Sequence, residues 1–255
     1  MPYIPKKSVI FFILIIFAFA MNAEKKSSSL FYQGEEKTSK RVGSLIKVRP
    51  EYEERYIILH RHTFPGVLDR IRKSNIRNYS IFLLNGILFS YYEYIGNDYE
   101  ADIKAIADSV TRDWWKLTDP MQEPLPTRKE GEWWAEMQQL ICLDKKIGPS
   151  PKARRIGITA EVIPGKEEEL KELCENFPPD LEAETNKKNF QNANMFFNDG
   201  RVYYYYEYTG DDIRKSLSEI GQNKIFKDFQ DEMNKLLVPK QNGYWEIMQE
   251  VFHTD

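Results

Sequence analysis

The segment that decides the fold is residues 78–98, NYSIFLLNGILFSYYEYIGND, which returns as residues 192–212, NANMFFNDGRVYYYYEYTGDD. In each copy, two aromatic-rich runs flank a two-residue pair, Asn85-Gly86 in the first and Asp199-Gly200 in the second. Asn-Gly and Asp-Gly tolerate the positive φ angles of a type I′ turn, and aromatic residues favour strands. The segment therefore predicts a β-hairpin that the chain makes twice.

The repetition continues on both sides of the hairpin at a constant offset of 114 residues. The residues of the first copy that recur in the second are Arg41, Gly43, Val48, Pro50, Pro65, Asn78, Phe82, Gly86, Tyr91, Tyr92, Glu93, Tyr94, Gly96 and Asp98. A series of this length at one spacing indicates an internal repeat. We assign residues 41–144 to the first repeat, residues 145–154 to a linker and residues 155–255 to the second repeat.

Each repeat contains the same predicted order of elements. A short strand (43–49 or 157–163) leads into a helix (51–73 or 166–176) that a proline precedes, and the hairpin follows. A second helix follows, with Asp98 or Asp212 as its N-cap, and a closing strand (134–138 or 245–249) ends the repeat. This is the βαββαβ, ferredoxin-like pattern. Such a sheet has helices on one face only, so we predict an α+β fold in which the two repeats form an intrachain pseudo-dimeric α/β barrel.

The N-terminus carries an export pattern. Lys6 and Lys7 precede the apolar run 9–20, which is short for a membrane span and ends in Ala18-Phe19-Ala20. We interpret residues 1–20 as a signal peptide, with an uncleaved membrane anchor as the alternative, and the polar residues 21–40 as a flexible leader. The mature protein is then expected to be exported, periplasmic or extracellular, and not stably membrane-associated.

Composition restricts the function classes. The formal net charge of −3 becomes −5 once residues 1–20 are removed, which argues against a nucleic-acid partner. The two cysteines, Cys142 and Cys174, lack the spacing of a metal site, and we expect ordinary buried thiols. Neither repeat shows a phosphate-binding glycine loop or a nucleophile elbow. We therefore expect no metal or other cofactor.

Side chains suited to chemistry concentrate in the first repeat. Tyr56 and His60 lie four residues apart and share one face of the predicted helix, which ends or bends at Phe64-Pro65. A lone histidine among aromatic residues is more often a packed side chain than a catalytic one, and these residues alone leave both readings open. Of Trp114 and Trp115, adjacent on a helix, one is expected in the core and the other available to a ligand. Glu136 is either a second proton station or part of an outward salt bridge, and His253 is expected in a frayed tail.

The spacing Tyr56-x-x-x-His60-x-x-x-Phe64-Pro65, followed by Asn78-Tyr79, Trp114-Trp115-Lys116 and Trp134-x-Glu136-Met137-Gln138, resembles the L-rhamnose mutarotase family, whose members are dimeric α+β barrels. The resemblance implies that His60 is the proton donor. It also implies that the sugar-binding residues are Tyr56, Tyr79, Trp114 and Trp115.

The second repeat departs from this pattern at the decisive positions. His60 is replaced by Cys174, Tyr56 by Leu170 and Tyr79 by Ala193, and the region of the tryptophan pair offers Asp228-Phe229-Gln230. We expect it to be a degenerate, structural copy, in a monomer that contains its own pseudo-dimer.

These features favour a mutarotase that interconverts the anomers of L-rhamnose or a related 6-deoxy sugar by general acid/base ring opening. Its partner is a small monosaccharide. Two alternatives remain open: a non-catalytic sugar-binding or structural barrel protein, and an oxygenase on the same scaffold.

Overall fold

The computed structural model describes residues 40–143 and 153–255, which belong to one compact unit, Thr38–Asp255. The predicted signal peptide and nearly all of the leader and linker lie outside these ranges.

The elements of the first repeat follow the predicted order, with short additions near its end. They are β1 (Lys40–Val48), a 3-10 turn (Pro50–Tyr52), α2 (Glu53–Arg61), α3 (Pro65–Lys73), β2 (Ile76–Leu84), β3 (Ile87–Tyr94), α4 (Tyr99–Ala105), α5 (Ser109–Thr118), a second 3-10 turn (Asp119–Met121), β4 (Gln122–Glu123), β5 (Ala135–Glu136) and β6 (Gln138–Cys142). The helix predicted for 51–73 is interrupted before Pro65, as predicted, because proline has no N–H to donate within a continuous helix, and α3 begins there. The second helix predicted for each repeat is also two helices, α4 and α5 in the first repeat and α8 and α9 in the second.

The second repeat mirrors the first. It contains β7 (Arg154–Glu161), α6 (Glu167–Glu175), α7 (Pro179–Asn186), β8 (Phe190–Asn198), β9 (Arg201–Tyr208), α8 (Ile213–Ile220), α9 (Lys224–Asn234), β10 (Glu246–Ile247) and β11 (Gln249–Thr254).

The local predictions hold at the hairpins and caps. Asn85 and Gly86 have φ angles of 49° and 76°, and Asp199 and Gly200 have φ angles of 46° and 72°, as a type I′ turn requires. The side chain of Asp98 accepts a hydrogen bond from the backbone N–H of Ala101 and caps α4.

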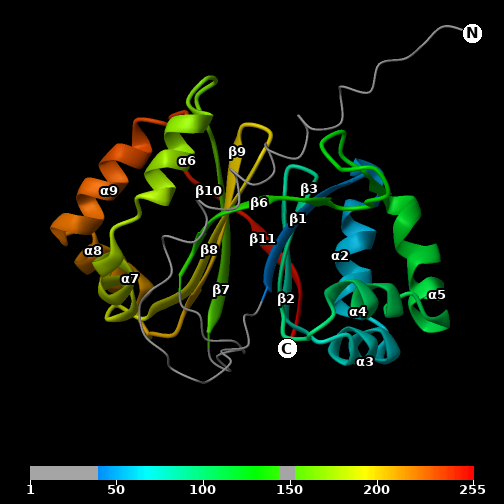
Figure 1. Cartoon of the computed structure of the whole chain (residues 1–255). Helices are drawn as coiled ribbons and strands as arrows, with labels where there is room; N and C mark the ends of the chain where they lie inside the picture. The colour runs from blue at the N-terminus through cyan, green and yellow to red at the C-terminus, as the bar shows by residue number, and fades with distance from the viewer. Residues whose placement is uncertain (1–39, 144–152) are drawn as a thin grey trace, which may run out of the picture. The chain divides into compact units, whose positions relative to one another are not determined.

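The strands form two antiparallel sheets that exchange their last strands. One sheet has the order β11-β2-β3-β1-β4, with β5 also on β1, and the other has the order β10-β7-β9-β8-β6. The closing segment of each repeat was expected to be one strand, but it divides. Ala135–Glu136 pairs with β1 of its own sheet, whereas Gln138–Cys142 crosses to β8. In the same way β11 crosses from the second repeat to β2 of the first (Figure 1).

The inner faces of the sheets meet in an aromatic core, and helices cover the outer faces (Figure 1). Two glycines permit the close approach. A Cβ on Gly43 would lie 2.7 Å from the ring of Phe196, and a Cβ on Gly157 would lie 2.6 Å from the ring of Phe82. This paired geometry explains why both the glycines and the phenylalanines recur at the 114-residue offset. The fold is thus the predicted tandem, pseudo-dimeric α+β barrel.

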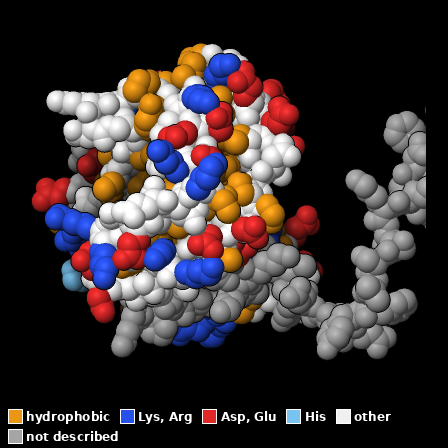
Figure 2. Space-filling model, turned by 90° about the vertical axis from the view of Figure 1, so that its left-hand side faces the viewer, with side chains coloured by type: hydrophobic (Ala, Val, Ile, Leu, Met, Phe, Trp, Pro, Cys, Tyr) orange, Lys and Arg blue, Asp and Glu red, His pale blue; other side chains and the backbone are white. Residues whose placement is uncertain are grey.

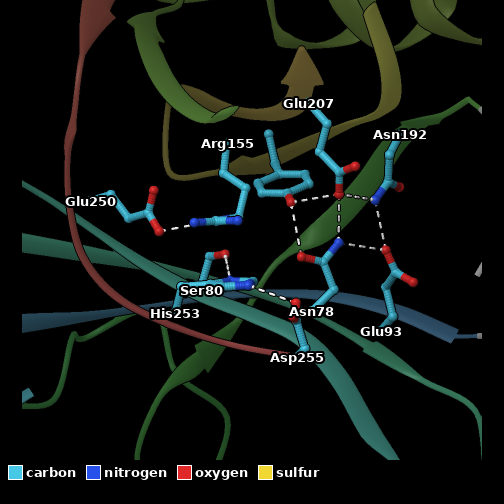
Figure 3. A network of polar contacts seen from close by, with 10 residues as sticks. Asn78, Ser80, Glu93, Arg155, Asn192, Glu207, Glu250, His253 and Asp255 are labelled. Atoms are coloured by element: carbon cyan, nitrogen blue, oxygen red, sulfur yellow. Dashed lines mark hydrogen bonds and ion pairs between the residues drawn. The ribbon is translucent and has the colours of Figure 1, made fainter. Parts of the chain in front are cut away.

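A buried polar network crosses the centre of this core. Glu93 and Glu207 are 0% and 1% exposed. The side-chain amide of Asn78 donates to both carboxylates, at 2.9 and 2.6 Å, and that of Asn192 donates to both at 2.6 and 2.8 Å (Figure 3). Both asparagines have positive φ angles, at positions where the β2–β3 and β8–β9 registers shift. The network therefore ties a bulge in each sheet to the other sheet.

Two minor expectations were wrong. His253 does not lie in a frayed tail, because β11 pairs with β2 and the imidazole Nδ1 lies 3.0 Å from Ser80 Oγ (Figure 3). Cys142 is exposed rather than buried, because β6 is the outermost strand of its sheet. Cys174 is buried as expected.

Gly43→Ala is expected to lower the free energy of unfolding by about 1–3 kcal/mol, because the new methyl group overlaps the Phe196 ring. Denaturant titration measures the change. Phe196→Leu in the Gly43→Ala background should recover part of the loss, with a coupling of about 0.5 kcal/mol or more between the two sites. Strictly additive effects would show that the predicted overlap is not what destabilises the variant.

Candidate active site

His60 lies in the last turn of α2, buried among aromatic rings with 8% of its surface exposed. Its imidazole stacks on Tyr56 at a centroid distance of 3.9 Å and meets Trp114 edge-on at 5.3 Å. Phe252, from the exchanged strand β11, completes the enclosure at 5.8 Å. The second repeat therefore supplies one wall around the histidine of the first.

The contacts of His60 fix its tautomer. Nδ1 lies 3.0 Å from the backbone carbonyl oxygen of Tyr56, an atom that only accepts hydrogen bonds. We therefore assign the ring proton to Nδ1, which leaves the lone pair on Nε2. Burial lowers the pKa of His60 to about 4, against a smaller opposing effect of the bond to the Tyr56 carbonyl. At neutral pH this residue is an uncharged imidazole that can accept a proton at Nε2.

Two adjoining cavities open around this imidazole, with volumes of about 250 and 360 Å³. The residues that line both are His60, Tyr79, Ile81, Trp114, Trp115 and Trp134. Tyr56 lines the larger cavity only. The structure thus brings Tyr56, Tyr79, Trp114 and Trp115 together with His60, although their roles stay predictions.

The two indoles differ in burial, as expected for neighbours on a helix. Trp114 is 5% exposed and belongs to the hydrophobic core, whereas Trp115 is half-buried. Both nevertheless line the two cavities, so the core indole also borders the space open to a ligand.

The phenols of the site hold their protons. Burial raises the pKa of Tyr56 well above its ordinary value, and burial likewise raises the pKa of Tyr79. The amide of Gln122 donates to the Tyr56 hydroxyl at 3.4 Å, and the Trp133 indole N–H donates to the Gln122 carbonyl oxygen at 2.8 Å. These neutral groups can orient a hydroxylated ligand.

Glu136 occupies a different environment. Its carboxylate lies 3.1 Å from Lys40 Nζ, and it lines neither cavity. A role for Glu136 in the second proton transfer remains a prediction. Asp119, which the sequence analysis did not single out, lines the larger cavity with His60, and burial raises the pKa of its carboxyl group.

Several site residues carried no local sequence signal. Gln122 begins the two-residue strand β4, Trp133 lies in the loop between β4 and β5, and Phe252 reaches the site only through strand exchange. The apolar pair Val251-Phe252 within an otherwise polar segment indicates a buried strand, but it does not indicate which repeat that strand joins.

The corresponding positions of the second repeat cannot support the same chemistry. Leu170 and Cys174 are buried there, and burial raises the pKa of the Cys174 thiol to about 12. This thiol keeps its proton at neutral pH. Within residues 40–143 and 153–255, no cluster of histidine, cysteine or acidic side chains has the arrangement of a metal site. No helix in these ranges has the length and apolar character to cross a bilayer.

His60 should make stability depend on pH. The unfolded chain protonates this side chain near pH 6.5, whereas the folded protein does so only near 4. As the pH falls between these values, the unfolded state binds a proton that the folded state does not, so the free energy of unfolding falls. Between pH 7 and pH 5, wild type is expected to lose about 2 kcal/mol more than His60→Gln, as measured by urea denaturation.

The exposed neighbour His62 provides the matched control. His62→Gln should retain the wild-type pH dependence. An equal loss of stability in wild type and His60→Gln would contradict the burial of a neutral imidazole at residue 60.

Both repeats match the same family of known proteins. The L-rhamnose mutarotase family matches residues 41–141 and again residues 155–254. The L-rhamnose mutarotase of Oceanobacillus iheyensis is 31% identical over 86 residues, which are 33% of this chain and 81% of that protein. That of Lactiplantibacillus plantarum is 30% identical over 86 residues, which are 32% of this chain and 80% of that protein.

Among solved structures, a monooxygenase-type protein from Fusobacterium nucleatum is 18% identical with a TM-score of 0.51, and the match covers 86% of this chain and 95% of that chain. At this identity the likeness concerns the fold alone. The family, in contrast, matches both repeats, and its members at about 30% identity are matched over most of their length. This chain belongs to the L-rhamnose mutarotase family.

Proposed function

We propose that this protein is a sugar mutarotase that interconverts the α and β anomers of L-rhamnose or a related 6-deoxy sugar. The observation that supports it best is the neutral imidazole of His60, with Nε2 free to accept a proton, inside an aromatic cavity of a chain that belongs to this family. The cavity of about 360 Å³ is within the range of small-ligand sites.

The proposed reaction needs only proton transfers. His60 Nε2 removes the proton of the anomeric hydroxyl, and an acid delivers a proton to the ring oxygen as the bond from that oxygen to C1 breaks. His60 is therefore the base when the ring opens, and it returns this proton, as the donor that the resemblance implies, when the ring closes. The open-chain aldehyde rotates about its C1–C2 bond. The ring hydroxyl then attacks the other face of the aldehyde, and the two proton transfers reverse. The reactant and the product have the same composition and oxidation state, so no group is consumed.

The aromatic walls suit this substrate class. Trp114, Trp115 and Trp134 present flat apolar surfaces, and Ile81 adds an aliphatic one. Such surfaces pack against the C–H face and the methyl group of a 6-deoxy sugar. The protonated phenols of Tyr56 and Tyr79 can hydrogen-bond its hydroxyl groups.

His60→Gln is expected to lower catalysed anomer exchange by about 100-fold or more, because the variant lacks the base at Nε2. Its affinity for the sugar should change far less. Saturation transfer between the anomeric protons, recorded by NMR on a panel of free sugars, measures exchange, and calorimetry measures binding.

The control for this test is His62→Gln, which should exchange anomers at the wild-type rate. Wild-type-like exchange in His60→Gln would remove His60 from the proposal. Wild-type protein that binds the sugar without accelerating exchange would be a sugar-binding module, the alternative that the sequence left open.

The acid in the reaction is proposed to be Asp119 or Glu136. Asp119 shares the larger cavity with His60 and has a raised pKa, whereas Glu136 is paired with Lys40. We therefore expect Asp119→Asn to lower exchange by about 10²-fold and Glu136→Gln to lower it less than about 3-fold. The reverse order would assign the role to Glu136, and two small effects would leave a tyrosine hydroxyl as the donor.

A further inference from the structure

The second repeat keeps a cavity where the first repeat has its candidate site. This second-copy cavity has a volume of about 200 Å³ and lies, partly open to solvent, between the sheet of β8 and β9 and the helices α7, α8 and α9. Its lining includes Phe177, Leu181, Ala193, Tyr204, Phe229 and Trp245. Leu217, also in the lining, is 47% exposed. Figure 2 shows the side of the molecule that carries α7, α8 and α9, where hydrophobic side chains reach the surface between charged ones.

The cavity is retained through compensating changes of side-chain size. At the 114-residue offset, Thr63 and Ser90 of the smaller first-copy cavity correspond to the larger Phe177 and Tyr204. In the other direction, Tyr79 corresponds to Ala193. A repeat that served only as scaffolding would gain stability by filling an apolar void, because empty space forfeits packing contacts. The second repeat therefore has a cavity at the equivalent place, but with a different lining.

Two hydroxyl groups in the lining are available to a ligand. Within residues 40–143 and 153–255, the hydroxyls of the half-buried Tyr204 and Tyr206 make no hydrogen bond to the protein, and both residues line the cavity. In the first repeat, the equivalent of Tyr206 is Tyr92, whose hydroxyl lies 2.6 Å from that of Tyr99. A ligand in the second-copy cavity could therefore hydrogen-bond a phenol that has no partner within the protein.

The chemistry of the lining restricts the ligand. None of the residues that line the cavity is charged, so a carboxylate or ammonium group would be buried without a counter-charge. The volume somewhat exceeds the ~150 Å³ apolar cavity that holds benzene in another protein. Near the position of the histidine, Leu170 and Cys174 offer no base at neutral pH. The lining therefore suits the binding of a ligand and offers no base for catalysis of its reaction.

We propose that the second-copy cavity binds a small, neutral, mainly apolar molecule that has one or two rings and one hydrogen-bonding group. The proposal is independent of the activity assigned to the first repeat.

Indole and phenol are the probes, added to the full chain and followed by calorimetry and ligand-observed NMR. We expect saturable binding at one site, and at least ten-fold weaker binding of benzoate, which carries a charge. Excess L-rhamnose should not displace indole, because the sugar is proposed to occupy the other repeat.

Ala193→Phe places an aromatic ring in the cavity and should weaken indole binding by at least ten-fold. Circular dichroism checks that this variant is folded. Tyr206→Phe, which removes one of the two hydroxyls and keeps the aromatic lining, should weaken phenol binding about five-fold and leave toluene binding unchanged. Trp115→Ala, in the first repeat, is the matched control and should leave indole affinity unchanged.

Three results would overturn the proposal: no saturable binding of either neutral probe, indole binding that folded Ala193→Phe retains, or binding that L-rhamnose or Trp115→Ala abolishes. The last result would place the probe in the first repeat.

Discussion

Two buried carboxylates that share their hydrogen-bond donors join the two sheets. Glu93 comes from one sheet and Glu207 from the other, and the amides of Asn78 and Asn192 each donate to both. A carboxylate removed from water without partners is very costly, and two of them side by side would be more so. Each sheet therefore supplies a hydrogen-bond donor to the buried glutamate of the other sheet. Neither repeat could bring these groups together alone.

This requirement extends to the candidate site. The strand exchange that accompanies the central contact lays β11 of the second repeat along β2 of the first, and β11 carries Phe252 to the edge of the His60 ring. The second repeat has lost the polar groups of the first, yet it forms part of the wall that excludes water from His60. It follows that the low pKa of His60 is a property of the whole tandem.

Much of the fold could be predicted from the sequence because its determinants are local. The turn pairs Asn85-Gly86 and Asp199-Gly200 and the cap Asp98 each act through backbone conformation or hydrogen bonds within a few residues. The tandem barrel was predicted from the internal repeat, because the helices of each repeat cover only one face of its sheet and the other face needs a partner. The crossing of β6 and β11 was not predictable from local sequence, because the pattern of apolar and polar residues in a strand does not specify which sheet the strand joins.

The site was predictable to a similar depth. Tyr56, His60, Tyr79, Trp114 and Trp115 were named from their spacing and from the resemblance, and they do line a common space. Asp119, Gln122 and Phe252 were missed. Asp119 and Gln122 lie in a 3-10 turn and a two-residue strand, which are too short to show a periodic pattern, and Phe252 comes from the other repeat. The burial that lowers the pKa of His60 comes from side chains that are distant in the sequence, such as Trp114 and Phe252, so residue spacing near His60 does not predict it.

The exchanged strand also determines when, during translation, the site of the first repeat can be completed. β11 comprises Gln249–Thr254, almost the last residues of the chain, and it is the partner of one edge of β2. While the ribosome makes the second repeat, that edge of the first repeat has no strand to pair with and its histidine has no Phe252 beside it. Completion of the enclosure is therefore deferred until β11 has been translated, which means that a nascent chain without this strand holds an unfinished pocket.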